Sequence, residues 1–348
     1  MLYNLHFLRV IAALAVVYYH TTSEAGLNLS VNIGSRGVDV FFVISGFIIA
    51  HIGKGSAPVS FIVRRLIRIV PFYWAATLFV FSVAFAFPSL LRSTAADVTH
   101  LAYSLAFVPH FSARSDGFFP TLILGWSLNF EMYFYALFAV SLALSRSYAP
   151  LLCCAGIGSV VAFAALSGID SPVLQFYGRP IALEFAFGVL AFYCFRWLSK
   201  FAPTLERKLS LKWLLIAGFI TSLLVICFFE AGQPNYPRYL VAGVPAFFAV
   251  LCAVLLERIF GVFTTNRTIH LLGESSYIIY LIHPYIIYSV LRVFVKNHDL
   301  TPSAILALIL GLLALASAFS VAMHVWFERP LMRALRHKLL PTARADRV

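Results

Sequence analysis

Arg9 and His20 lie eleven residues apart in the apolar segment that begins the chain. On an α-helix this spacing leaves a net rotation of ~20° and an axial separation of ~16 Å, so the two side chains share one face. A cation and a proton carrier inside a bilayer are costly, and such residues usually have a function. The pair therefore predicts a functional path along the first helix.

Two carboxylates are candidates for the same path. Asp39 stands near the start of a second apolar segment, and Glu131 lies inside a later one. A carboxylate near a histidine can orient its imidazole ring. For Glu131, a structural salt bridge to an arginine of a neighbouring helix is the alternative.

A polar stripe surrounds Glu131. Ser127, Glu131 and Tyr135 are spaced i, i+4, i+8, directly after Trp126. On a helix these polar side chains share a face, which must point into protein or water. Trp126, Ser127 and Tyr135 are therefore candidate substrate-binding residues.

A second stripe occurs near the end of the chain. Ser276, Tyr280 and His283 are spaced i, i+4, i+7, and Tyr277 lies beside them. Pro284 cannot donate an amide hydrogen, which frees the carbonyl of Tyr280. His283 either satisfies only this local defect or binds substrate together with Tyr277 and Tyr280.

Three arginines, Arg64, Arg65 and Arg68, form the densest basic cluster outside the C-terminal tail. Such a cluster can hold phosphates through several charge-assisted hydrogen bonds. The alternative is a topology anchor that contacts anionic lipid. Ser45, next to Gly46 in the second apolar segment, is a candidate ligand contact, with close helix packing as the alternative.

The composition is that of an integral membrane protein. Of the 348 residues, 61% are hydrophobic and 11% charged, and the mean hydropathy is +0.90. These values lie outside the range of soluble globular proteins. The net charge of +12 fits the positive-inside rule better than nucleic-acid binding. The five cysteines show no metal-ligand or redox spacing, so we expect no metal site.

The apolar stretches predict an all-α polytopic bundle with about ten transmembrane helices. The weaker stretch 98–111 is excluded, because the basic connections around Arg64 and Lys200 should both be cytoplasmic, which requires an even number of crossings between them. Both termini are then cytoplasmic, residues 1–330 form one membrane domain, and 331–348 form a basic cytoplasmic tail. The predicted spans are 5–22, 38–53, 71–88, 121–143, 149–167, 181–198, 213–230, 239–256, 275–295 and 303–326.

Taken together, these segments resemble the bacterial membrane acyltransferase family 3, in particular its exopolysaccharide-acetylating members. The ordered set is specific and covers nearly the whole chain. The matching features are Arg9 with His20, Asp39 to Phe47, Arg64 to Pro71, Trp126 to Tyr135, Ser276 to Pro284 and Glu328 to Pro330.

The resemblance implies transfer of an acyl group, most often acetyl, from cytoplasmic acyl-coenzyme A to a hydroxyl of a cell-envelope or exported polysaccharide or glycolipid. It places the enzyme in the bacterial inner membrane, with polysaccharide biosynthesis proteins as expected partners. A base must then activate the hydroxyl, and a histidine with an unperturbed pKa of ~6.5 suits this role near pH 7. We therefore expect His20 to be the base, with Asp39 or Glu131 orienting it.

On the same reading, the arginine cluster and Arg9 would hold the donor. An acyl-histidine relay is the alternative to direct transfer. From a different class, a transporter or flippase for an envelope glycan precursor would also use intramembrane charges. A scaffold for a polysaccharide synthase is the third possibility.

Overall fold

The computed structural model describes nearly all of the chain as helices joined by short connections. Among the described residues, the only β-type pairing is an isolated bridge between Ser112 and Gly117. The chain divides into two compact units, which are Met1–His51 with Leu183–His324, and Ile52–Ala182 with Val325–Val348. The described residues are 2–26, 34–53, 55–89, 91, 94–112, 114–228, 236–294 and 301–340.

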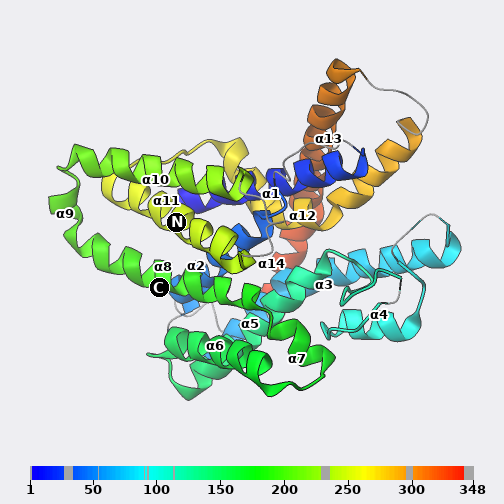
Figure 1. Ribbon diagram of the computed structural model, residues 1–348, viewed down its shortest axis with the longest axis horizontal. Helices are drawn as coiled ribbons and strands as arrows, with labels where there is room; N and C mark the ends of the chain where they lie inside the picture. Colours follow the sequence, from blue (N-terminus) through cyan, green and yellow to red (C-terminus); the bar gives the residue numbers. More distant parts are fainter. Residues whose placement is uncertain are drawn as a thin grey trace. The chain divides into compact units, whose positions relative to one another are not determined.

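The first unit is built from long apolar helices (Figure 1). Short helical turns connect some of them: η2 Ser199–Phe201, α9 Ala202–Leu205 and the π-helical turn η3 Tyr239–Gly243. The long helices are α1 Tyr3–Glu24, α2 Gly37–Gly53, α8 Leu183–Leu198, α10 Leu209–Phe228, α11 Val244–Phe260, α12 Arg267–Phe294 and α13 Pro302–Met323. The last two residues of α2 belong to the second unit.

The second unit contains both long and short helices. Its long helices are α3 Pro58–Ala86, α5 Gly125–Leu144 and α6 Ala149–Ser167. Its shorter helices are α4 Val98–Leu105, α7 Pro172–Tyr177, the 3-10 turn η1 Pro180–Ala182 and α14 Arg329–Leu339. The π-helical turn η4 His324–Glu328 precedes α14.

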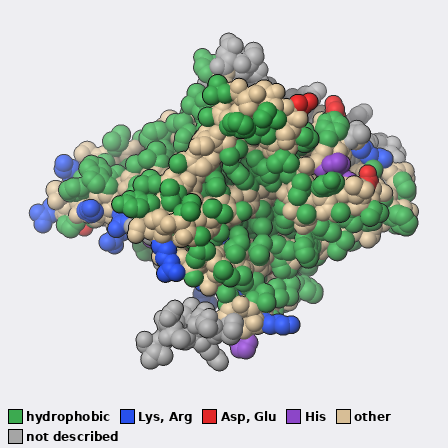
Figure 2. Space-filling model, turned by 90° about the horizontal axis from the view of Figure 1, so that it is seen from below, with side chains coloured by type: hydrophobic (Ala, Val, Ile, Leu, Met, Phe, Trp, Pro, Cys, Tyr) green, Lys and Arg blue, Asp and Glu red, His purple; other side chains and the backbone are tan. Residues whose placement is uncertain are grey.

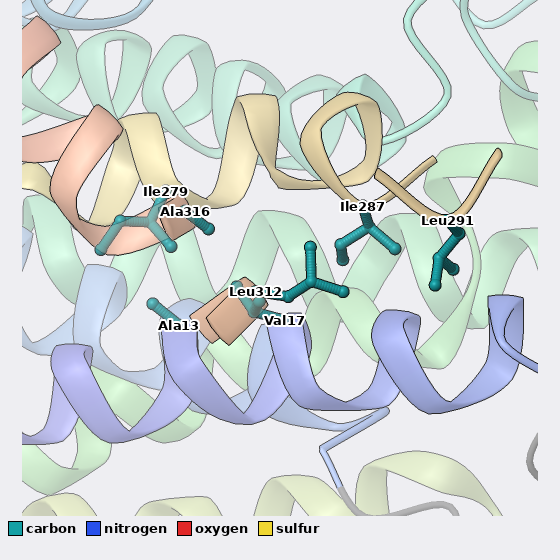
Figure 3. Close-up of a cluster of buried hydrophobic side chains, with 7 residues drawn as sticks. All are labelled: Ala13, Val17, Ile279, Ile287, Leu291, Leu312 and Ala316. Carbon is teal, nitrogen blue, oxygen red and sulfur yellow. The ribbon is translucent and has the colours of Figure 1, made fainter. Parts of the chain in front are cut away.

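Helix α1 packs against α12 and α13 in the first unit. Figure 3 shows the buried side chains at this contact, with Ala13 and Val17 from α1 meeting residues of α12 and α13. The small side chains of Ala13 and Ala316 let the helix backbones approach closely. This packing fixes the two helices that carry Arg9, His20 and His283.

Helices α2 and α8 also approach closely. A Cβ atom added to Gly46 would lie 2.1 Å from the carbonyl oxygen of Phe185, and one added to Gly188 would lie 2.1 Å from that of Val43. Only glycine fits at either position, so Gly46 has a packing role. The rings of Phe42 and Phe185 stack at 4.5 Å about one turn earlier in both helices.

The helices have the length and surface of membrane spans. In the described part of the chain, eight helices are long and apolar enough to cross a membrane, and α2 is a shorter apolar helix. Large hydrophobic side chains such as Leu166 (86% exposed) and Leu144 (74%) point outward, and the face in Figure 2 is mostly hydrophobic. The predicted all-α polytopic membrane fold is confirmed.

Each of the ten predicted spans overlaps a described helix. Residues 229, 230 and 295, at the ends of two of these spans, lie outside the described residues. The number of crossings and the cytoplasmic position of both termini stay predictions. Helix α3 begins at Pro58, well before the predicted start at residue 71, because Pro71 lies inside the helix without ending it. The stretch 98–111 contains only the eight-residue α4, which is too short to cross a bilayer.

Candidate functional site

A histidine pair lies between α1 and α12 in the first unit. The ring centroids of His20 and His283 are 5.1 Å apart, with the ring planes inclined by 51°. His20 is half-buried and His283 fully buried. The sequence did not predict this contact, since the two histidines lie in different helices.

The hydrogen bonding of His283 defines its tautomer. Its Nδ1 atom lies 3.0 Å from the carbonyl oxygen of Ile279. A carbonyl oxygen can only accept, so Nδ1 carries the hydrogen and Nε2 of the neutral ring is an acceptor. That Nε2 atom is buried without a hydrogen-bond partner among the described residues. A buried acceptor without a donor is costly, and it lies in the ring beside His20.

Arg9, like His20, contacts helix α12. Its Nε atom donates a 3.0 Å hydrogen bond to Oγ of Ser276 on α12. The Ser276 hydroxyl in turn donates to the carbonyl oxygen of Gly273 at 2.8 Å. Arg9 and His20 therefore do share one face of α1, as their spacing predicts.

The other predicted residues of α12 lie beside these contacts. Tyr277 and Tyr280 are buried, and the Tyr280 ring is 6.2 Å from that of His283. The Phe41 ring of α2 packs edge-on against Tyr280 at 6.3 Å. Ser45 is half-buried on α2, one turn beyond Phe41.

Asp39 is fully buried at the start of α2 and pairs with Arg238. Nε of Arg238 donates to Oδ1 at 2.9 Å and its Nη2 donates to Oδ2 at 2.7 Å. The Glu184 carboxyl of α8 also faces Asp39. None of the contacts described for Asp39 involves His20, so the structure does not bring this carboxylate to the predicted base.

The second unit holds the arginine cluster together with the predicted residues of α5. The guanidinium of Arg65 lies 5.6 Å from the ring centre of Phe61 and 5.7 Å from that of Tyr135. The Tyr135 hydroxyl donates to the Glu131 carboxylate. Arg65, Tyr135 and Glu131 thus form one polar group within the apolar helices α3 and α5.

The first turn of α5 carries the remaining two predicted residues. Ser127 is buried, and its hydroxyl donates to the carbonyl oxygen of Leu124 at 3.2 Å. The Trp126 ring packs edge-on against Phe130 at 6.2 Å.

A third arginine, Arg336, lies near Arg64 and Arg68. Helix α14 packs against α3, and Arg336 of α14 is electrostatically coupled to Arg68 and Arg64. Three arginines from two helices therefore form a positive centre, which we call the arginine centre. Like charges repel one another, so this arrangement favours an anionic ligand.

Sequence reasoning missed three of these residues as site residues: Arg238, Glu184 and Arg336. Arg238 directly precedes an apolar stretch, and an arginine at a membrane edge is usually an anchor. Its pairing with Asp39 spans 199 residues of sequence. Among the residues that the structure describes, no three His, Cys, Asp or Glu side chains are grouped as metal ligands.

Comparison with known proteins gives a consistent result. Residues 2–323 match the family model of an acyltransferase domain. The exopolysaccharide production protein ExoZ of Rhizobium meliloti (strain 1021) is 33% identical over 335 residues, covering 94% of this chain and 98% of the relative. No solved structure matches the chain.

Two further relatives are longer proteins. The peptidoglycan O-acetyltransferase OatA of Listeria monocytogenes is 27% identical over 310 residues, which cover 79% of this chain and 48% of OatA. The O-acetyltransferase OatA of Staphylococcus aureus (strain NCTC 8325) is 25% identical over 307 residues, which cover 79% of this chain and 49% of the relative. The match thus spans about half the length of these two relatives.

Proposed function

This chain belongs to acyltransferase family 3, and we propose that it moves an acetyl group from cytoplasmic acetyl-coenzyme A to a hydroxyl of an envelope or exported polysaccharide. The names of the relatives, which refer to exopolysaccharide production and peptidoglycan O-acetylation, support a glycan acceptor. The apolar helices and the bacterial relatives support a multi-pass protein of the inner membrane.

The observation that carries the proposed mechanism is the histidine pair. The ring of His20 is half-buried, and the fully buried ring of His283 lies 5.1 Å from it. Neutral imidazole accepts a proton near pH 7, and a low-dielectric site strengthens the effect of each polar neighbour. His20 is accordingly the general base of the proposal.

The proposed reaction is a direct transfer. His20 takes the proton from the acceptor hydroxyl as that oxygen attacks the carbonyl carbon of the thioester. The carbon–sulfur bond breaks, coenzyme A leaves as a thiolate, and the thiolate takes up a proton. The proposed role of Arg9, whose Nε donates to Ser276 of α12, is to bind polar groups of the donor.

The arginine centre is the proposed site for the phosphates of the donor. Arg64, Arg68 and Arg336 supply planar guanidinium groups, which bind phosphate oxygens in pairs. With both termini cytoplasmic, α3 begins on the cytoplasmic side, where coenzyme A is found. The guanidinium of Arg65 faces the rings of Phe61 and Tyr135 and interacts electrostatically with Glu131, so its proposed role is to position the Glu131–Tyr135 pair.

The experiment is a comparison of polysaccharide composition. The gene is deleted from the organism that carries it, and the mass and acetate content of the envelope polysaccharide are measured with and without a plasmid copy. We expect the deletion to remove acetyl groups and the plasmid to restore them. Unchanged acetyl content in the deletion strain would exclude the proposed acceptor. The transporter and scaffold alternatives predict altered export or synthesis of the polysaccharide instead.

A further inference from the structure

Two acidic side chains meet in the first unit, away from the histidine pair. Asp39 lies in the first turn of α2 and Glu184 in the first turn of α8. The stacked rings of Phe42 and Phe185, together with the Gly46–Gly188 contact, hold these two turns at the same level. Both carboxyl groups are completely buried, and we call them the carboxyl pair.

The two carboxyl groups have unequal partners. Arg238 donates to both oxygens of Asp39, whereas both oxygens of Glu184 are buried without a hydrogen-bond partner in the described part of the chain. Arg36, also buried, faces Asp39 and Arg238 and donates to the carbonyl oxygen of Val241 at 3.5 Å.

The space around Glu184 is too small for an additional donor on the side of η3. A Cβ atom added to Gly243 would lie 2.9 Å from Cγ of Glu184 and 3.2 Å from its Oε1. A water molecule has no room between this backbone and the carboxyl group. On this side Glu184 has no donor, and the acidic neighbour described for it is Asp39.

An ionised Glu184 would face a second carboxylate with no hydrogen-bond donor on either of its oxygens, although Arg238 lies near enough to interact with it electrostatically. Burial without donors and a neighbouring negative charge both disfavour the charged form of a carboxyl group. Asp39 already accepts two hydrogen bonds from Arg238, one on each carboxylate oxygen. We propose that the carboxyl pair is a proton-binding site. Glu184 holds one proton, and its O–H group donates a hydrogen bond to Asp39.

The charged and titratable groups around the pair come from three elements. Arg36 precedes α2, Arg238 precedes η3, and Tyr280 of α12 is electrostatically coupled to Arg238. With one proton on the pair, the two arginines face a single carboxylate. The bound proton thus keeps this buried cluster one charge more positive than the same cluster without it.

Infrared spectroscopy tests this proposal directly, and its result does not depend on the proposed acetyl transfer. A protonated carboxylic acid has a C=O stretching band that is separate from that of a carboxylate and shifts in D₂O. The protein is purified in a detergent without ester groups, and spectra are recorded at neutral pH. The chain has only 14 Asp and Glu residues, so few other carboxyl groups can contribute to the acid band.

We expect an acid band in the wild-type protein and its loss in Glu184→Gln. The carboxamide N–H of glutamine replaces the O–H donor to Asp39, so this variant should keep the wild-type melting temperature. The matched control, Glu206→Gln, changes an exposed carboxyl group and should leave the band intact. Absence of the band in the wild-type protein, or its persistence in folded Glu184→Gln, would overturn the proposal.

If the Glu184→Gln protein does not fold in sufficient amount, isotope labelling of the wild-type protein tests the origin of the acid band instead. Glutamate carrying ¹³C in its side-chain carboxyl group should shift the acid band to lower frequency. A band that shifts with neither labelled glutamate nor labelled aspartate does not come from the carboxyl pair and contradicts the assignment.

Discussion

Arg238 binds both carboxylate oxygens of Asp39 across 199 residues of sequence. The Asp39 side chain is fully buried, while that of Arg238 is 40% exposed. The ion pair therefore joins the start of α2 to the turn before α11, within the unit that carries the histidine pair. The contacts described for Asp39 are with Arg238 and Glu184, whereas the ring of His20 contacts those of Tyr19 and His283.

Replacing Arg238 should destabilise the protein. Arg238→Ala would leave Asp39 buried without its cation, at a cost of about 3 kcal/mol. The expected result is a lower melting temperature in detergent. Arg207→Ala, at an exposed position of the same unit, is the control and should change the melting temperature little. Equal melting temperatures for the two variants would show that the ion pair does not stabilise the unit.

The role of His283 can be tested by separating its two nitrogen atoms. In His283→Asn, the carboxamide N–H can replace Nδ1 as the donor to Ile279, but no acceptor replaces Nε2. If the Nε2 acceptor takes part in proton transfer, acetyl transfer should fall by about 10²-fold while the protein stays folded. Full activity in His283→Asn would show that the histidine only satisfies the backbone of α12.

The arginine centre should bind the phosphates of coenzyme A. Arg68→Ala and Arg336→Ala should each weaken binding by about tenfold, since a lost charge-assisted hydrogen bond costs about 1.4 kcal/mol. Calorimetry with coenzyme A and with its dephosphorylated form would measure this. Arg146→Ala, an exposed arginine after α5, is the control. If Arg146→Ala weakens coenzyme A binding as much as the other two variants, the loss comes from the lower net positive charge of the protein and not from the arginine centre.

Local sequence patterns predicted the helices and which side chains share one face of a helix. The length of the apolar stretches predicted the spans, and the Arg9–His20 spacing predicted that both side chains share one face of α1, because positions within one helix follow from its geometry. That this face contacts α12 is seen only in the structure. The span predicted from residue 71 covers only the apolar part of α3, which begins at Pro58 and carries Arg64, Arg65 and Arg68 before that part.

Contacts between distant segments could not be read from the sequence. The pairing of Asp39 with Arg238 and the approach of Arg336 to Arg68 depend on how helices pack, and no local pattern encodes that packing. Glu184 and its neighbour Asp39 likewise belong to different helices. The roles predicted for His20, Glu131 and the other site residues stay predictions.

Acetyl transfer by His20→Ala tests the central claim most directly. Wild-type and variant proteins are placed in lipid vesicles with labelled acetyl-coenzyme A and the polysaccharide acceptor, and labelled polysaccharide is counted. His51→Ala, which changes an exposed histidine of α2, is the control and should keep its activity. The account predicts a loss of about 10²-fold or more for folded His20→Ala. Wild-type transfer by that variant would contradict it.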